Sequence, residues 1–443
     1  MRRPTSSSLD DSKQLDEDAF TRGAAHRADR PPRQKTAFTP VVTGFLLFFS
    51  LLILGDVIYL YDLSSNELGT TKSTDASLTA PLMQTNMNTN TNMNTNTSID
   101  KVIATQHEEP EDPSSYTLDK GPILKILSQA GIEVTDLDVA TLKALPTWSQ
   151  IQRLFGDRPR ILGLETCQAF RESVDPSVKF FGIAGTFNTG TNLLSELMIQ
   201  NCQITERMKV YGNQSKGMRW QVPWGKHYPA SQRGAHVTTT DGAVPHENSL
   251  PLVTIRDPYQ WMQSMCRHKY EAKWSFTKEH CPNLVPTADD KLKRSDLQGK
   301  ETVPVTISYS AAKHFSVTHH SLVHLWNEWY NLYFSASFPR IMVRFEDLLF
   351  YGEEVTETLC KCGGGVPRED RKFPHFVYVS ESAKLGTAAH GKHKTGLLDA
   401  LIKYGNDDHR LDHLTPEDLA LAAKILDPKL MEYFGYTNPG GTV

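Results

Sequence analysis

The chain has 443 residues, of which 39% are hydrophobic and 22% charged, and this composition fits a globular protein with one large domain or two. Its net charge of −4 argues against a nucleic-acid binder that works through bulk positive charge. The six cysteines favour disulfides in an oxidising compartment, although the sequence alone does not choose among the possible pairings.

The N-terminal segments predict a membrane-anchored chain. Residues 1–40 are polar and should form a disordered cytoplasmic tail. Residues 41–61 form an apolar run long enough to cross ~30 Å of hydrocarbon, so we expect a transmembrane signal-anchor helix there. Basic residues cluster before this run and only Lys72 follows closely, so the positive-inside rule places the remaining chain in the lumen. Residues 62–115 contain a tandem TNMNTN repeat and predict a low-complexity luminal stem.

The folded domain is expected to cover residues 116–443. It should begin with short helices at residues 123–130 and 140–155, the second interrupted by Pro146. Apolar strands are then expected at residues 178–183, 252–256 and 340–345. Helical stretches separate these strands, and this alternation predicts an α/β fold with a central parallel sheet and helices on both faces.

Other parts of this domain have less specific patterns. Residues 321–330 predict an amphipathic helix whose aromatic side chains belong to the core. The polar residues 275–310 predict a long loop that serves as a lid or as an acceptor-binding insertion. Asn96 and Asn213 begin glycosylation sequons, which suit a glycoprotein if the domain is luminal.

A Gly- and Thr-rich turn follows the first expected strand and precedes a helix over residues 192–199. The N–H groups and positive dipole of a helix start favour a bound phosphate or sulfate, and Gly185 and Gly190 let the backbone approach it. The pattern alone fits an ordinary strand–turn–helix equally well. The ligand-binding residues expected in this turn are Thr186, Phe187, Asn188, Thr189, Gly190, Thr191 and Asn192.

A second strand-to-helix junction carries Arg256, with Ser264 eight residues later. Asp257 should cap a helix that runs from Pro258 to about Lys273. Arg256 then lies at the carboxyl end of a strand, where ligands of open α/β sheets bind, and an arginine can hold a phosphate bidentately. The alternative is a surface ion pair with Ser264 on a solvated helix face.

The two junctions together resemble the sulfotransferase family, which uses 3′-phosphoadenosine 5′-phosphosulfate (PAPS). Residues 188–191 resemble the family's Lys/Arg-Ser/Thr-Gly-Thr element, which holds the 5′-phosphosulfate, and Arg256 with Ser264 matches its 3′-phosphate pair in spacing. Residues 343–348, VRFEDL, are similar to a later strand-end element of the family. The resemblance covers roughly residues 175–400 and implies a P-loop-like three-layer fold.

The chain departs from this family at Asn188, where a lysine or arginine usually stabilises the leaving group. We expect Lys226 to supply the missing cation. A basic, Gly-flanked loop with Lys392 and Lys394 is similar to the family's C-terminal contact to the 3′-phosphate, although it could also be an ordinary solvated loop.

Sulfuryl transfer to a hydroxyl needs a base, and His227 is our candidate because an imidazole titrates near neutral pH. It lies in a rigid, aromatic-rich segment. The resemblance does not fix this residue, and the rival candidates are Glu196, His236 and Glu247. The catalytic set expected here is His227, Lys226 and Asn188, and the chemistry requires no metal.

The resemblance and the membrane topology together predict a single-pass type II Golgi membrane enzyme. It would transfer sulfate from PAPS to a hydroxyl, probably of a glycan, with its catalytic domain in the lumen and with no nucleic-acid partner. A nucleotide-dependent P-loop kinase is the first alternative, but the turn lacks the Gly-Lys-Ser/Thr of such enzymes. The second alternative is a non-catalytic nucleotide- or glycan-binding protein on the same scaffold.

Overall fold

The computed structural model describes residues 113–212, 216–234, 244–310, 315–368, 376–381 and 396–440. The expected tail, the expected transmembrane helix at 41–61, nearly all of the expected stem and both sequons lie outside these ranges. Within them, no helix combines the length and the apolar character that crossing a membrane requires.

The domain is built around a five-stranded mixed sheet with the strand order β1-β9-β5-β2-β4. β2, β4, β5 and β9 pair in parallel, whereas β1 pairs antiparallel with β9. The expectation of a purely parallel sheet is therefore wrong at one edge. β1 is only two residues long and enters from the N-terminal helices, and antiparallel edge strands are common on parallel sheets. The strands are β1 (Ile161–Leu162), β2 (Phe180–Gly185), β4 (Met218–Arg219), β5 (Ser249–Ile255) and β9 (Ile341–Arg344).

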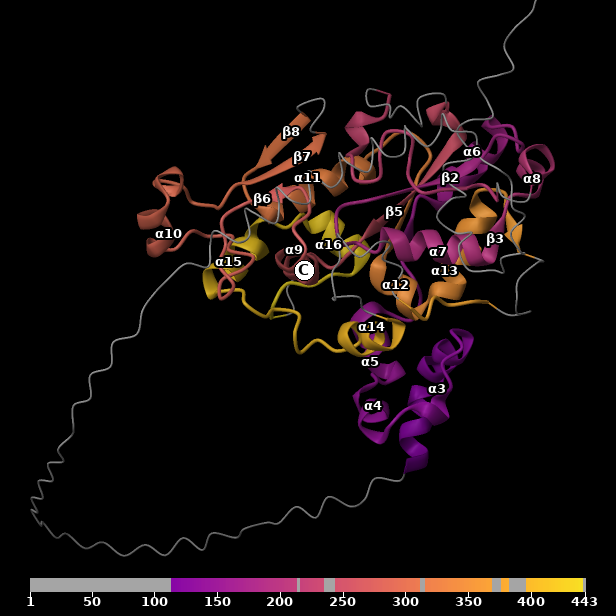
Figure 1. Ribbon diagram of the computed structural model, residues 1–443, viewed down its shortest axis with the longest axis horizontal. Coiled ribbons are helices and arrows are strands. Elements are labelled where there is room, and N and C mark those ends of the chain that lie inside the picture. Colours follow the sequence, from indigo (N-terminus) through magenta and orange to yellow (C-terminus); the bar gives the residue numbers. More distant parts are fainter. Residues whose placement is uncertain are drawn as a thin grey trace, which may run out of the picture. The chain divides into compact units, whose positions relative to one another are not determined.

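Helices cover both faces of this sheet (Figure 1). Even-numbered residues of β5, such as Leu252, join one hydrophobic cluster, and odd-numbered ones, such as Val253, join the other. This alternation follows from the pleat of a strand that is buried on both sides. One face carries α3 (Pro113–Gln129), α5 (Trp148–Phe155), α6 (Cys167–Ser173), α7 (Thr191–Asn201), α12 (Phe345–Phe350), α13 (Gly352–Cys362) and α14 (Leu397–Tyr404). The other carries α9 (Pro258–Arg267), α11 (Leu322–Phe334), α15 (Pro416–Ile425) and α16 (Pro428–Phe434).

Most of the expected local elements are present. The N-terminal helices are confirmed, with α4 (Val139–Ala144) and α5 separated at Pro146, and Thr147 forms a capping box at the start of α5. The expected aromatic helix is α11. α9 is shorter than expected, because His268 takes an extended conformation and Ala272–Lys273 form the strand β6. The remaining short elements are α8 (Thr205–Tyr211), β3 (Cys202–Gln203) and β10 (Val366–Pro367).

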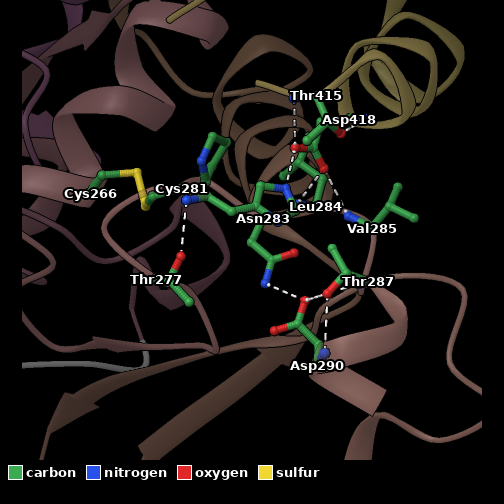
Figure 2. Close-up of polar contacts among 12 residues, drawn as sticks. Cys266, Thr277, Cys281, Asn283, Leu284, Val285, Thr287, Asp290, Thr415 and Asp418 are labelled. Atoms are coloured by element: carbon green, nitrogen blue, oxygen red, sulfur yellow. Dashed lines mark hydrogen bonds and ion pairs between the residues drawn. A yellow bond between two sulfur atoms is a disulfide. The ribbon is translucent and has the colours of Figure 1, made fainter. Parts of the chain in front are cut away.

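The expectation of a long loop at residues 275–310 is wrong. This stretch contains α10 (Ala288–Lys293) and β7 (Val305–Ser310), and β7 pairs with both β6 and β8 (Phe315–His319). The buried Asp418 of α15 accepts hydrogen bonds from the backbone N–H groups of Leu284 and Val285 (Figure 2). The stretch is thus fastened to the body of the domain.

Disulfides join all six cysteines, as the sequence led us to expect. The pairs are Cys167–Cys362, Cys202–Cys360 and Cys266–Cys281. Two of them tie the last turn of α13 to the start of α6 and to β3, and the third ties the end of α9 to the stretch 275–310. Such pairings fit a domain that folds in an oxidising compartment.

The VRFEDL element of the sequence forms a buried ion pair. Arg344, at the end of β9, donates two hydrogen bonds to Asp347, at 2.7 and 2.6 Å, and both side chains are fully buried. Arg344 also donates to the carbonyls of Phe155 and Phe434. This element therefore joins β9 to the N-terminal and C-terminal helices.

We predict that Asp347→Ala lowers the free energy of unfolding by about 3–5 kcal/mol, because it leaves the Arg344 guanidinium buried without its partner. Glu357→Ala, which removes the exposed pair with Lys361, is the control and should cost at most about 1 kcal/mol. Urea denaturation measures both values. Equal effects would show that the buried pair has no special weight.

Candidate functional site

Glycine is needed at two positions around the turn between β2 and α7, at Gly190 for its backbone conformation and its packing and at Gly185 for its packing alone. Gly190 has φ 83°, and an added Cβ would lie 2.4 Å from the ring of Phe345. At Gly185 an added Cβ would lie 2.4 Å from the hydroxyl oxygen of Thr254. The turn is therefore packed directly against the ends of β5 and β9.

The threonine hydroxyls of this turn form bonds inside the protein. Thr189 donates to the carbonyl of Thr186 at 2.8 Å and contacts the hydroxyl of Thr254 at 2.9 Å. The hydroxyl of Thr186 lies 3.0 Å from that of Tyr330. These two side chains hold the turn in shape. No side chain caps Gly190 at the start of α7, so the helix presents its positive end to an anion.

Arg256 joins the turn to β5. Its Nη1 atom donates to the backbone carbonyl of Asn188 at 2.9 Å. The guanidinium packs against the edge-to-face pair of Phe345 and Tyr404, with its central carbon 4.6 Å from each centroid. Among the described residues, its buried Nε and Nη2 atoms have no acceptor in good hydrogen-bonding geometry; the closest candidate is Tyr404, whose pKa is lowered by the charge of Arg256 and by hydrogen bonding to it. Two strong donors are thus held ready for an acceptor.

Further positive charge gathers beside Arg256. Arg267 donates to the hydroxyl of the buried Ser264 at 2.8 Å. Burial would raise the pKa of Tyr404, but the neighbouring Arg256, Lys403 and Arg267 together lower it. The central carbon of Arg256 lies 4.6 Å and Nζ of Lys403 lies 5.7 Å from the ring centroid of Tyr404, and the charge of Arg267 also acts on this ring, so three cations from α9, α14 and the end of β5 lie near it. We call these three cations, together with the serine that Arg267 contacts, the cation cluster: Arg256, Arg267, Lys403 and Ser264.

A buried carboxyl group lies behind the cation cluster. Glu346 accepts hydrogen bonds from the backbone N–H of Asp257 and from the hydroxyl of Tyr436. Burial raises the pKa of Glu346 to about 7, and the neighbouring Asp257 adds to this effect. Glu346 therefore neutralises Arg256 only in part at neutral pH, and an anion would still be attracted.

Asp257 has the capping role expected from the sequence. Its carboxylate accepts from the backbone N–H of Gln260 at 3.0 Å, and Pro258 occupies the first turn of α9. Arg410 also donates to it, at 3.0 and 2.7 Å. These bonds fix the direction of α9, and with it the position of Ser264.

The side chain of Asn188 points away from the start of α7. Its amide donates to the carbonyl of His268 at 2.7 Å, at the end of α9. Asn188 has φ 62°, a left-handed conformation that asparagine tolerates better than most residues. Asn188 therefore serves the turn through its backbone, and its amide is occupied elsewhere.

Lys226 and His227 lie on the other side of the turn. The Nζ atom of Lys226 donates to Oδ1 of Asn192, in the first turn of α7, at 3.0 Å. Nδ1 of His227 lies 2.7 Å from the carbonyl oxygen of Gly185 and must donate to it, so Nε2 carries the lone pair. Burial lowers the pKa of His227 to about 4. The imidazole is therefore neutral at neutral pH, but it is a weaker base than the near-neutral titration expected from the sequence, because burial disfavours its protonated form.

The rings of Phe187, His227 and Tyr270 form an aromatic group next to the turn. Phe187 lies 4.6 Å from His227 and 5.2 Å from Tyr270, centroid to centroid, and its carbonyl accepts from Trp261. Phe187 thus supports the imidazole by contact.

The other sequence-predicted residues have mixed positions. Thr191 is buried at the start of α7, and Glu196 lies one turn beyond Asn192 on the same helix, where burial raises its pKa. Glu247 lies in a short 3-10 helix before β5. His236, Lys392 and Lys394 lie outside the described residues.

A cavity of about 820 Å³ adjoins the cation cluster. Arg267 and Lys403 form part of its wall, and the stretch 275–310 supplies Phe276 and Thr277. The disulfide Cys266–Cys281 lies in the same wall (Figure 2). Neither Arg256 nor any residue of the turn lines this cavity, and its wall also contains Asp399, Asp408 and Asp412.

Comparison of the chain with protein-family models, with characterised proteins and with solved structures finds no match. Any function must therefore be argued from the residues and the geometry.

Sequence reasoning missed Arg267, Lys403 and Tyr404. Arg267 could have been found, because it lies three residues after Ser264 and so on the same face of a helix. Lys403 and Tyr404 come from α14, far along the chain, and nothing in the local sequence indicates their position.

We predict that Gly190→Ala lowers the free energy of unfolding by more than Gly131→Ala. Both glycines have positive φ, but an added Cβ meets Phe345 only at Gly190 and meets nothing within 4 Å at Gly131. Gly131→Ala should cost about 1 kcal/mol, the usual penalty of a positive φ in an open position. Denaturant titration of the two variants measures the difference. A smaller loss for Gly190→Ala would mean that the turn does not pack on Phe345 as described.

Proposed function

We propose that the chain is a PAPS-dependent sulfotransferase with the three-layer, P-loop-like arrangement of that family. The observation that carries the proposal is the hydrogen bond from Arg256 to the carbonyl of Asn188. It unites the two sequence elements that resemble the family into one continuous anion-binding surface. Neither element alone is specific, but a nucleotide with phosphates at both ends needs both of them.

The two ends of the donor would be bound in different ways. The 5′-phosphosulfate would lie at the start of α7, where Gly190 leaves the helix without a side-chain cap. The 3′-phosphate would lie on the cation cluster, where Nε and Nη2 of Arg256 are buried without an acceptor in hydrogen-bonding geometry. A phosphate dianion would supply acceptors for both of these donors and for Arg267.

His227 would act as the general base. Its Nδ1–H donates to the carbonyl of Gly185, so Nε2 would take the proton from the hydroxyl group of the substrate that receives the sulfate. As the acceptor oxygen bonds to sulfur, the bond from sulfur to the phosphate oxygen breaks, and the chain's cations stabilise the bisphosphate that leaves. Lys226, beside the first turn of α7, is the nearest candidate for the cation that Asn188 does not supply.

We propose that the acceptor is a glycan. A type II membrane anchor at residues 41–61 would place the domain in the Golgi lumen, where that glycan is found. The disulfides favour a secretory compartment. The anchor and the compartment remain predictions of the sequence.

A second candidate is nucleotide binding without turnover. It is favoured by one observation, the bond of the Asn188 amide to His268, which turns this side chain away from the proposed sulfuryl position. Transfer of radiolabelled sulfate from PAPS to a mixed glycan pool separates the two candidates.

Calorimetric titration of the purified full-length chain tests the donor site itself. The proposal expects tight binding of adenosine 3′,5′-bisphosphate and much weaker binding of ATP, which lacks a 3′-phosphate. A folded sample that prefers ATP would favour the kinase alternative, and one that binds neither nucleotide would reject the proposal.

We predict that Arg256→Gln weakens bisphosphate binding by roughly 10–100-fold, since a charge-assisted hydrogen bond contributes about 1.5–3 kcal/mol. Arg207→Gln is a matched control. Arg207 is also buried over two rings, Phe180 and Tyr211, and donates to a backbone carbonyl, but it lies on α8 away from the turn. Equal binding by both variants would remove Arg256 from the phosphate site.

We predict that His227→Gln lowers turnover by roughly 10²–10⁴-fold, the usual contribution of a general base, and leaves bisphosphate affinity within a few-fold. The labelled-sulfate assay and calorimetry measure the two quantities. A variant that loses affinity but keeps its turnover number would exclude His227 as the base.

A further inference from the structure

Lys226 is the buried amine closest to the start of α7. Only 5% of the residue is exposed, and its Nζ lies over the ring of Trp220. Among the described residues, the one hydrogen bond of this atom goes to Oδ1 of Asn192. An ammonium group has three donors, so a charged Lys226 would be short of acceptors in the ligand-free protein.

The surroundings of Lys226 therefore favour the neutral amine. Burial lowers its pKa to about 6, and the attraction of Glu196 offsets only part of this effect. Two titratable groups face it: Glu196, one turn further along α7, and His227, its neighbour in sequence. His227 is neutral at neutral pH and adds no acceptor for the ammonium.

We propose that anion binding at the start of α7 is coupled to the uptake of one proton by Lys226. The inference rests on the proposed function, because it assumes that the 5′-phosphosulfate or 5′-phosphate binds there. An anion beside the first turn would add a charged acceptor to the amide of Asn192 and the ring of Trp220. The chain would thus generate, on binding, the positive charge that the family carries permanently at the position of Asn188.

The coupling has a definite sign. If the bound anion raises the pKa of Lys226 above its free value of about 6, the complex binds more protons than the free protein at higher pH. Affinity must then fall as the pH rises. The contribution of Lys226 between pH 6 and pH 8 amounts to up to roughly 50-fold in affinity. A donor site of this kind would bind best in a mildly acidic compartment.

The test is calorimetry of the full-length chain with adenosine 3′,5′-bisphosphate at pH 7.4. The titration is repeated in buffers of different ionisation enthalpy that carry no phosphate or sulfonate. The slope of the binding enthalpy against that quantity gives the protons taken up. The ligand contributes little, because phosphate esters, with a second pKa of about 6, are almost fully ionised at this pH. Wild type should take up close to one proton.

Lys226→Met should abolish this uptake. Lys179→Met is the matched control, because Lys179 is equally buried, over Phe170, with one bond to the carbonyl of Arg171. It precedes β2, at the end of the strand opposite to the turn, and its removal should leave the uptake unchanged. If Lys226→Met does not fold, Lys226→Arg takes its place, because a permanently charged guanidinium takes up no proton and the uptake should again be lost.

The outcomes separate the two proposals. Bisphosphate binding without proton uptake by wild type, or with equal uptake by Lys226→Met, overturns the inference and leaves the proposed function standing. No bisphosphate binding by the folded wild type rejects both.

Discussion

The hydrogen bond from Arg256 to the carbonyl of Asn188 is the interaction on which the site depends. It connects the end of β5 to the turn after β2, two adjacent strands whose carboxyl ends meet at one edge of the sheet. Parallel strands make this meeting possible, since each presents its strand-to-helix turn at the same edge. The backbone carbonyl oxygen of Asn188 is therefore the atom of the turn that the arginine contacts.

Holding Arg256 in this place requires support from distant parts of the chain. The rings of Phe345 and Tyr404, from α12 and α14, contact its guanidinium, and Arg410 donates hydrogen bonds to the neighbouring Asp257. A buried guanidinium with unused donors is costly without an anion, and such cost is common where a ligand binds. Asp418 and the disulfide Cys266–Cys281 fasten the stretch 275–310 to the domain, and this stretch forms part of the wall of the cavity next to the cation cluster.

The parts of the fold that the sequence predicts are those determined locally. The strands at β2, β5 and β9, the cap at Asp257 and the glycines of the turn all follow from neighbouring residues. Strand β7 was missed, although its alternating pattern of Val305 and Ile307 is typical of a half-buried strand, because its polar surroundings suggested a loop. The antiparallel β1 was missed because two residues carry too little pattern.

The candidate site divides in the same way. The sequence places Arg256, Ser264 and the turn, which come from two local motifs. It does not place Lys403 and Tyr404, since α14 reaches the site only through the tertiary fold. Nor does it reveal that the Asn188 amide turns toward His268, because this orientation depends on the extended conformation at the end of α9.

A crystal structure of the chain with adenosine 3′,5′-bisphosphate tests the central claim most directly. The account predicts that the 3′-phosphate accepts hydrogen bonds from Arg256 and Ser264 while the 5′-phosphate lies at the start of α7. A bisphosphate bound elsewhere, with Nε and Nη2 of Arg256 still without an acceptor, would contradict it.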